Sequence, residues 1–273
     1  MRIAYLECAS GISGDMTLAA LVDAGADLAK IQADIDSLGL PGCRLVSREV
    51  QKNGFRALQI VVEHAPEKAH RHLHHITAMI DRGTLSPRAR DTAKRIFQKL
   101  AEAEAKVHGT TVEKVHFHEV GAVDSIADIV GTAIAFDLLD VAQVACSPIP
   151  TGNGFVDIAH GKCAIPAPAT GELLRGVPIA PTAVEGELPA PTRAAIARLT
   201  GHELLARPED AALRRSIELK EPSLDPLNFI QIQLLRDYRG GRDRGAPAAE
   251  LELFEQALVS SIEGVATGLG TTG

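Results

Sequence analysis

The sequence contains no tryptophan, and aromatic residues make up only 3% of its 273 residues. Proteins that bind single-stranded nucleic acids stack bases on exposed aromatic rings, so this composition disfavours such a function. Basic residues are also in the minority, with 28 Lys and Arg against 35 Asp and Glu and a formal net charge of -7. Because a mildly acidic surface repels phosphate backbones, we expect no nucleic-acid partner.

The sequence also lacks secretion and membrane signals. The segment Met1–Cys8 has the pattern of a strand, without the basic flank and apolar core of a signal peptide. No uncharged run approaches the roughly 20 residues that span a bilayer, so we expect no membrane partner and a cytoplasmic location. The four cysteines are far apart and form no Cys-x-x-Cys pair, which predicts free thiols in a reducing compartment. They are Cys8, Cys43, Cys146 and Cys163.

A glycine-containing loop, Gly11-Ile-Ser-Gly-Asp15, follows the expected first strand at 2–8 and precedes an apolar helical run from Met16 to Ala24. It matches neither the Walker loop nor the dinucleotide fingerprint. Backbone N–H groups at a helix N-terminus nevertheless bind anions, which makes the loop a candidate cofactor-binding site. The candidate residues are Gly11, Ser13, Gly14 and Asp15. The alternative is a tight strand-to-helix turn in which Asp15 caps the helix or lies in its first turn.

Strand and helix patterns alternate along the chain, which predicts an α/β or α+β fold with mixed sheets and flanking helices. This pattern is compatible with two subdomains divided near 140–150. The clearest helix begins at Ser86-Pro87 and ends at Gly109, with Ile96, Leu100, Ala103 and Val107 as one buried stripe. We expect further helices at 28–38, 76–80, 129–139, 169–174, 191–199 and 251–265. We expect further strands at 44–50, 55–63, 144–149, 155–159, 163–166 and 228–235. Asn53-Gly54 predicts a hairpin turn between the strands at 44–50 and 55–63, and the composition of residues 239–247 predicts a linker.

The segment His116-Phe-His118-Glu119 is the first candidate metal site. If it is extended, both imidazoles point to the same face and can bind one ion. Asp124 and Asp128 are spaced four apart, on one face of a helix expected to begin near Ser125. Imidazole suits zinc, copper, iron and nickel, and carboxylates add harder ligands. The alternative is a surface loop with incidental histidines and a capping aspartate.

A second histidine-rich segment runs from His64 to His75. Within it, His70 and His74 are spaced four apart and His72 and His75 three apart, so that each pair shares a helix face. Such a group is suited to loading or relaying a metal ion, although a solvated loop has the same composition. The isolated His160-Gly161 is interpreted as structural. No Gly-x-Ser-x-Gly elbow and no clear nucleophile with an adjacent base are present.

Several long motifs in one order resemble the LarC family of nickel-insertion proteins. They begin with Tyr5-Leu-Glu-Cys-Ala-Ser-Gly-Ile-Ser-Gly-Asp-Met16 and continue through the central run from Val115 to Gly131. The remaining motifs are Ala101–Gly109, Ser147–Gly154, His160-Gly161 and Pro166–Leu174, so the resemblance covers roughly residues 1 to 200.

The resemblance implies a lyase-class, CTP-dependent enzyme that inserts nickel into pyridinium-3,5-bisthiocarboxylic acid mononucleotide, forming the nickel-pincer cofactor of lactate racemase-type enzymes. Combined with the residue patterns above, it makes His116, His118 and Glu119 the hypothetical catalytic donor set, with Asp124, Asp128, His70, His72 and His74 as further candidate nickel ligands. CTP with a divalent metal is expected to bind through the family's C-terminal part. We expect that part to be largely absent here, with a homo-oligomer or the separate C-terminal portion as partner.

The resemblance places a LarC-like N-terminal region at 1–240 and a linker with the start of a C-terminal part at 241–273. Two segments depart from the family pattern, at 187–193 and 214–220, and Arg193 is expected to obstruct a phosphate-approach loop. These sequence features leave three candidate functions. The first is a nickel-inserting enzyme, and the second is a nickel-storage or chaperone module that needs a CTP-binding partner. The third is a zinc hydrolase with Glu119 as its general base.

Overall fold

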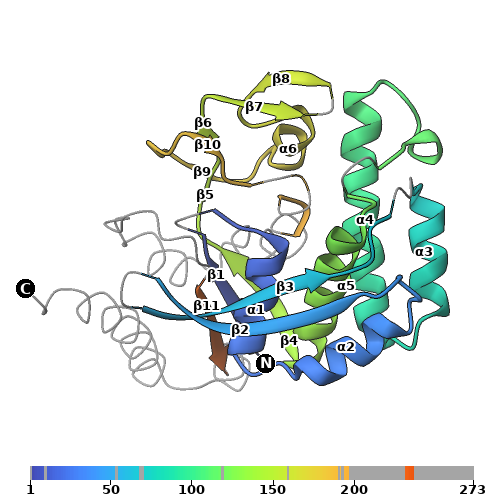
Figure 1. Cartoon of the computed structure of the whole chain (residues 1–273). Coiled ribbons are helices and arrows are strands. Elements are labelled where there is room, and N and C mark those ends of the chain that lie inside the picture. The colour runs from blue at the N-terminus through green and yellow to red at the C-terminus, as the bar shows by residue number, and fades with distance from the viewer. Residues whose placement is uncertain are drawn as a thin grey trace, which may run out of the picture.

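The computed structural model describes residues 2–8, 11–52, 55–67, 71–117, 120–158, 160–189, 191, 194–196 and 231–236. A three-stranded sheet has β1 (Arg2–Glu7) at its centre, with β4 (Val141–Cys146) parallel to it on one side and β11 (Gln231–Arg236) antiparallel on the other (Figure 1). All three strands were expected from the sequence. The α/β class is therefore confirmed.

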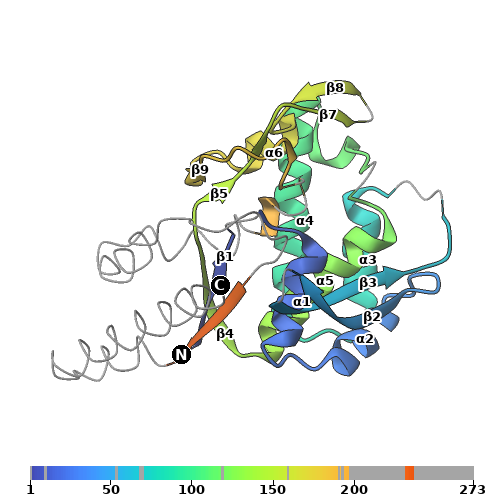
Figure 2. The same cartoon turned by 60° about the vertical axis from the view of Figure 1, so that its left-hand side comes forward.

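Two helices cover this sheet, α1 (Gly14–Asp23) and α5 (Val123–Leu138), and both also contact the hairpin of β2 (Arg44–Lys52) and β3 (Phe55–Glu63) (Figures 1 and 2). Because α5 is covered from several sides, nearly all of its apolar residues are buried. It begins earlier than expected, since Asp124 and Asp128 interrupt the apolar run without interrupting the helix. Asp124 lies in the first turn, where the helix dipole favours a carboxylate.

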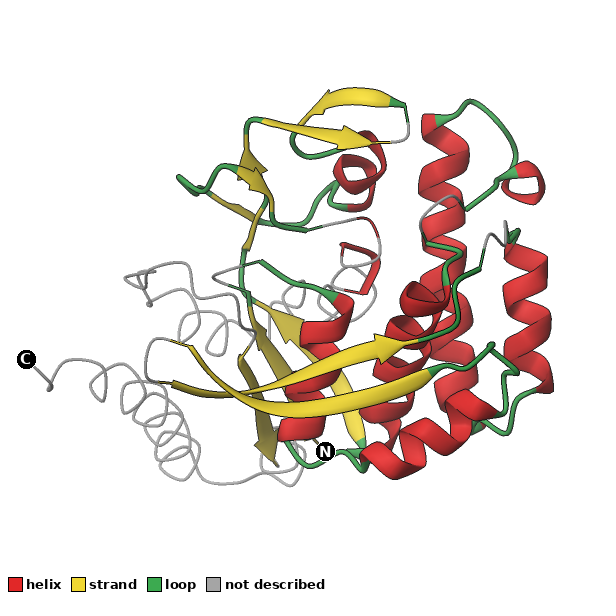
Figure 3. Cartoon of the chain, viewed as in Figure 1, coloured by secondary structure: helices red, strands yellow, loops and turns green. Residues whose placement is uncertain are grey.

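Further helices are α2 (Leu28–Asp36), α3 (Leu73–Arg82), α4 (Pro87–Val107) and the 3-10 turn η1 (Val112–Lys114). Helix α4 has the predicted cap, because the Ser86 hydroxyl accepts from the Ala89 amide at 3.0 Å. Helices α3 and α4 run antiparallel and side by side (Figure 3).

One part of the predicted α4 stripe is wrong. Ile96, Leu100 and Ala103 are buried as expected, but Val107 is 39% exposed. The last turn of α4 extends beyond the helices that bury the rest of the stripe and instead borders a pocket.

Short strands and one helix lie beside the C-terminal half of α4, to its left in the view of Figure 1. The strands pair as β5 (Ile149–Pro150) with β9 (Ile179–Ala180), β6 (Gly152–Asn153) with β10 (Gly186–Glu187), and β7 (Phe155–Ile158) with β8 (Gly161–Ala164). The helix is α6 (Pro168–Leu173), which overlaps the helix expected at 169–174 and contacts α4.

Some expectations lie outside the described residues. These are the Asn53-Gly54 turn, the linker at 239–247 and the helix at 251–265. Of the helix expected at 191–199, residues 191 and 194–196 are described and are helical. All four cysteines are free thiols, as predicted, with Cys163 only half-buried. Among the helices that the structure describes, none combines the length and apolar character needed to cross a bilayer.

Candidate metal-binding site

An isolated antiparallel bridge joins Arg71 to Phe117 and thereby brings the two histidine-rich segments together. In this bridge the Phe117 amide donates to the Arg71 carbonyl at 3.2 Å. The two segments were interpreted as separate candidate sites, because nothing in their spacing predicts this contact. The structure instead makes them neighbours at the start of α3 and the loop that precedes α5.

Four imidazoles gather across the bridge, and we call His72, His74, His75 and His116 the histidine cluster. The ring centroids of His72 and His116 are 4.0 Å apart, and those of His74 and His75 are also 4.0 Å apart. His72 links these pairs, with its centroid 5.4 Å from that of His74 and 5.5 Å from that of His75. Clustered imidazoles provide the nitrogen donors that nickel and neighbouring transition metals prefer.

The hydrogen bond of His72 fixes its tautomer. Its Nδ1 lies 2.8 Å from the Val115 carbonyl oxygen, which can only accept, so Nδ1 carries the proton. In a neutral ring the lone pair is then on Nε2. Metal-binding histidines are typically held in this way, with one ring nitrogen donating to a carbonyl and the other left for the ion. The loop that carries His116 therefore also orients His72.

His75 has a different arrangement. Its Nδ1 accepts from the His72 backbone amide at 3.2 Å, which satisfies one of the free N–H groups at the start of α3. The Nδ1 lone pair of His75 is therefore in use. Desolvation, together with the nearby His74, His72 and Arg71, lowers the pKa of His75. The lowered pKa favours the neutral form of the ring, and the hydrogen bond makes His75 a support for the backbone at His72.

Arg71 connects the two segments that carry the histidine cluster. Its guanidinium pairs with Glu67 at 2.5 and 2.9 Å and donates to the Gly121 carbonyl at 2.8 Å. The hydrogen bonds from Arg71 lower the pKa of Glu67. Only 12% of the Arg71 side chain and 17% of the Glu67 side chain are exposed, so this pair is partly shielded from water. One arginine thus fastens the segment before α3 to the loop before α5.

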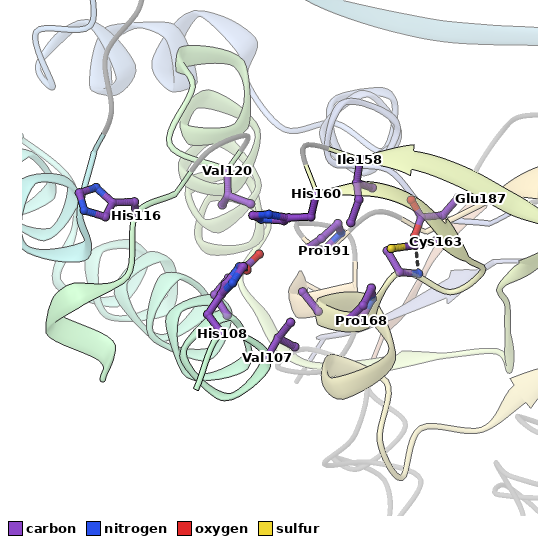
Figure 4. Close-up of a pocket in the computed structure, with 13 residues that line it drawn as sticks. Val107, His108, His116, Val120, Ile158, His160, Cys163, Pro168, Glu187 and Pro191 are labelled. Atoms are coloured by element: carbon purple, nitrogen blue, oxygen red, sulfur yellow. Dashed lines mark hydrogen bonds and ion pairs between the residues drawn. The ribbon is translucent and has the colours of Figure 1, made fainter. Parts of the chain in front are cut away.

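A pocket of about 310 Å³ lies next to the cluster, between the end of α4, α6 and the β7–β8 hairpin. His116 belongs to the histidine cluster and also lines the pocket. Figure 4 shows the His116 ring at one edge of the pocket, directed away from His108 and His160. The ring of His72 is a close neighbour of the His116 ring, with the two centroids 4.0 Å apart.

The pocket combines apolar walls with a few polar groups. His108 and His160 have ring centroids 4.8 Å apart, and Cys163 lies on the same lining. The carboxylates are engaged by neighbours, since Glu104 lies 3.4 Å from His108 Nε2 and Glu187 accepts from the Ala167 amide at 3.1 Å. The sequence interpretation did not assign these pocket residues, and it took His160 as structural. The only signal for His108 and His160 was their place in the quoted motifs.

Several predicted ligands are not placed. His70, His118 and Glu119 lie outside the described residues, so their assignment stays a prediction. Asp124 is exposed, and one of its carboxylate oxygens accepts from the Ser125 amide at 2.8 Å. Asp128 lies against Gly14, where an added Cβ would be 2.5 Å from Asp128 Oδ2. Asp128 therefore borders the predicted glycine loop.

The glycine loop forms the predicted turn into a helix. Ser13 caps α1 by accepting from the Met16 amide at 3.1 Å, and Asp15 lies in the first turn. Gly11 has a φ of +88° and packs tightly against Leu188, where a Cβ would be 3.0 Å from the Leu188 Cβ. With the carboxylate of Asp128 beside Gly14, the N-terminus of α1 already has an anion next to it. Binding of a phosphate there stays a prediction, and this carboxylate weighs against it.

No three His, Cys, Asp or Glu side chains in the described part of the chain already stand in a geometry that would hold a metal ion. The histidine cluster therefore provides neighbouring donors, and binding an ion requires its rings to turn. His116 and His74 are exposed, which leaves room for such rotation.

Comparison with known proteins identifies the family. The family model described as "Nickel insertion protein" matches residues 4–244. A protein of Desulfitobacterium hafniense strain DCB-2, named pyridinium-3,5-bisthiocarboxylic acid mononucleotide nickel insertion protein, is 53% identical over 196 residues, covering 72% of this chain and 49% of its own length. The same-named protein of strain Y51 is 52% identical over the same shares of both chains.

A relative in Rhodopirellula baltica, provisionally named as a nickel insertion protein, is 54% identical over 211 residues, which cover 77% of this chain and 53% of the relative. The chain thus spans about half the length of the curated relatives it matches. No solved structure matches it. The match over residues 4–244 and identities above 50% lead to one conclusion: the chain belongs to the nickel insertion protein family.

Proposed function

We propose that this chain takes part in inserting nickel into pyridinium-3,5-bisthiocarboxylic acid mononucleotide, with the histidine cluster as the site that presents the metal. One observation carries the proposal: in a member of this family, the bridge from Arg71 to Phe117 places His72 beside His116. The relatives in Desulfitobacterium hafniense bear the name of this reaction. Nickel is here the cargo of the protein.

The chemistry that we propose is ligand exchange. Neutral imidazoles of His72, His74 and His116 bind Ni²⁺ through nitrogen, and the two thiocarboxylate groups of the acceptor replace them with sulfur. The metal stays divalent, so no oxidant or reductant is needed. His118 and Glu119 follow His116 and Phe117 directly in the chain, and we propose that they complete the donor set.

The finer features are also proposals. We infer a CTP-dependent, lyase-class reaction in the cytoplasm, in which CTP and its divalent metal bind to a C-terminal portion that the described residues do not represent. Either a separate C-terminal chain or a homo-oligomer would then complete the enzyme. Within this scheme residues 1–240 form the nickel-handling region, and 241–273 link it to the rest.

The direct test mixes the pure chain with Ni²⁺, CTP, Mg²⁺ and the bisthiolated mononucleotide, with and without an added C-terminal portion from a relative. The nickel-containing product is then measured by mass spectrometry. Product formation that depends on the chain supports the proposed function. Nickel binding without product in either mixture contradicts it and supports a storage or chaperone module.

A further inference from the structure

The pocket beside the histidine cluster has no assigned occupant. Its volume of about 310 Å³ falls within the usual range for small-molecule sites and suits a mononucleotide-sized ligand. The walls come from separate elements: α4 contributes Val107, the loop before α5 contributes Val120, and β7 contributes Ile158. Apolar side chains on several sides suit a flat ring better than a free phosphate or a sugar alone.

Val107 is the most informative of these residues. It is 39% exposed where the helix pattern predicted burial, and it lines the pocket beside other apolar residues. Its exposed surface faces the pocket together with Pro168 of α6. A ligand there would cover this apolar surface and gain the free energy of removing it from water.

The polar groups of the pocket indicate the chemistry of the ligand. His108 and His160 lie side by side on the lining, and Cys163 adds a soft sulfur. Imidazoles can donate hydrogen bonds to anionic substituents of a ligand, and the Cys163 thiol is a weak donor that can also contact a sulfur atom. The lining carboxylates Glu104 and Glu187 are engaged by His108 and the Ala167 amide, so the pocket fits an aromatic ring with anionic, sulfur-containing substituents.

Its position relative to the metal donors is the decisive point. His116 is shared, since it lines the pocket while its ring lies 4.0 Å, centroid to centroid, from that of His72. A ligand in the pocket is therefore next to the histidine cluster without displacing it. Metal transfer between two sites requires this proximity, because an ion that loses its nitrogen ligands must meet its new donors before it escapes to water.

We propose that this pocket binds the heteroaromatic acceptor of nickel, with its sulfur-bearing edge nearest His116. This inference rests on the proposed function for the identity of the metal's acceptor. It adds the place of binding and makes Val107 a wall of the acceptor site. Rotation of the His116 side chain from His72 toward the pocket would then carry the ion across the shared edge.

The test uses two helix-end residues that differ mainly in location. Val107 is the last residue of α4 and Leu138 the last residue of α5, and their exposed fractions are 39% and 38%. Val107→Glu and Leu138→Glu therefore add the same charge against the same end of a helix dipole. Leu138 is not part of the pocket lining, so Leu138→Glu controls for general effects.

Binding is measured by calorimetry in the full chain with the dicarboxylate analogue, pyridinium-3,5-biscarboxylic acid mononucleotide, and separately with Ni²⁺ alone. We expect Val107→Glu to weaken analogue binding at least about tenfold, because it places a negative charge against the ring and the anionic substituents of the ligand, while Leu138→Glu leaves binding unchanged. Ni²⁺ affinity should be the same in both variants.

Equal analogue binding by the two variants, or no binding by the unsubstituted chain, would overturn the pocket assignment. Neither result concerns the proposed function, which the product assay decides independently. A chain that binds the analogue at Val107 and yields no nickel product would leave the pocket standing and refute nickel insertion.

Discussion

The imidazole rings of His72 and His116 lie with their centroids 4.0 Å apart, although one precedes α3 and the other precedes α5. The backbone bridge between Arg71 and Phe117 is adjacent to both rings and fixes their approach. The two histidine-rich segments thus form one group of donors. The predictions below concern this group and its supports.

Arg71 should be a positioning residue for the histidine cluster. Arg71→Met leaves Glu67 without its partner in a partly shielded place and removes the hydrogen bond to Gly121, so we expect a loss of about 1–3 kcal/mol in unfolding free energy. Nickel affinity should fall about 10- to 100-fold, as is typical when supports of metal ligands are lost. Chemical denaturation and calorimetry measure the two effects.

The matched control is Arg56→Met. Arg56 also pairs with two carboxylates, Asp23 and Glu49, but on the exposed surface of the hairpin. Surface pairs contribute little, so stability and nickel affinity should both remain close to those of the unsubstituted chain. A loss of nickel affinity equal to that of Arg71→Met would refute the positioning role.

Gly14 should be required for the packing of α1 against α5. In Gly14→Ala the new methyl carbon would meet Asp128 Oδ2 at 2.5 Å and Asp128 Cβ at 2.6 Å, so the helices must separate. We expect a cost of about 1–3 kcal/mol in unfolding free energy. Gly171→Ala in α6 is the control, because its nearest neighbour would be Pro166 Cγ at 3.8 Å and alanine favours helix by about 0.5–1 kcal/mol. A harmless Gly14→Ala would contradict the close approach.

The pKa of His75 should lie below the ordinary histidine value of about 6.5. Desolvation is the main cause, and His74, His72 and Arg71 add to it. Because His74→Ala removes one of these groups, we expect the pKa of His75 to rise toward 6.5, measured by NMR titration of the ring protons. An unchanged or lower pKa in His74→Ala would show that His74 does not act on this ring.

The lowered pKa of His75 also determines how the folding stability changes with pH. The unfolded chain takes up a proton at His75 at higher pH than the folded chain, so acidification favours unfolding. The loss of folding stability begins as the pH falls to about 6.5 and is complete once the pH is below the lowered pKa of His75 in the folded chain. Nickel binding should weaken in the same direction, since metal ions require neutral imidazoles.

Local signals predicted most of the elements. The Ser86-Pro87 start of α4 and the alternating patterns of β2 and β3 appear in the structure because caps and periodicity depend on neighbouring residues. The start of α5 was predicted too late in the chain, because Asp124 and Asp128 interrupt the apolar pattern of a helix whose apolar residues are nearly all buried. Val107 was placed in the core because periodicity shows which face a residue is on and does not show where the packed neighbours end.

The site was predicted only in part. Both histidine segments were selected as candidate metal sites, but their contact depends on a single long-range bridge that no local pattern encodes. The pocket residues come from α4, α6, β7 and β8, which meet only through tertiary packing. Asp128 was grouped with the histidines by its spacing, whereas packing sets it beside Gly14.

The most direct test of the joined histidine site is a double-mutant cycle. Nickel affinity is measured by calorimetry for His72→Ala, His116→Ala and the double variant, with the exposed His64→Ala as control and circular dichroism to verify folding. If both rings bind one ion, each single variant should lose at least about tenfold in affinity, and the double variant should lose far less than the product of the two losses. Losses that multiply fully, or single variants that bind nickel as tightly as His64→Ala, would contradict a shared site.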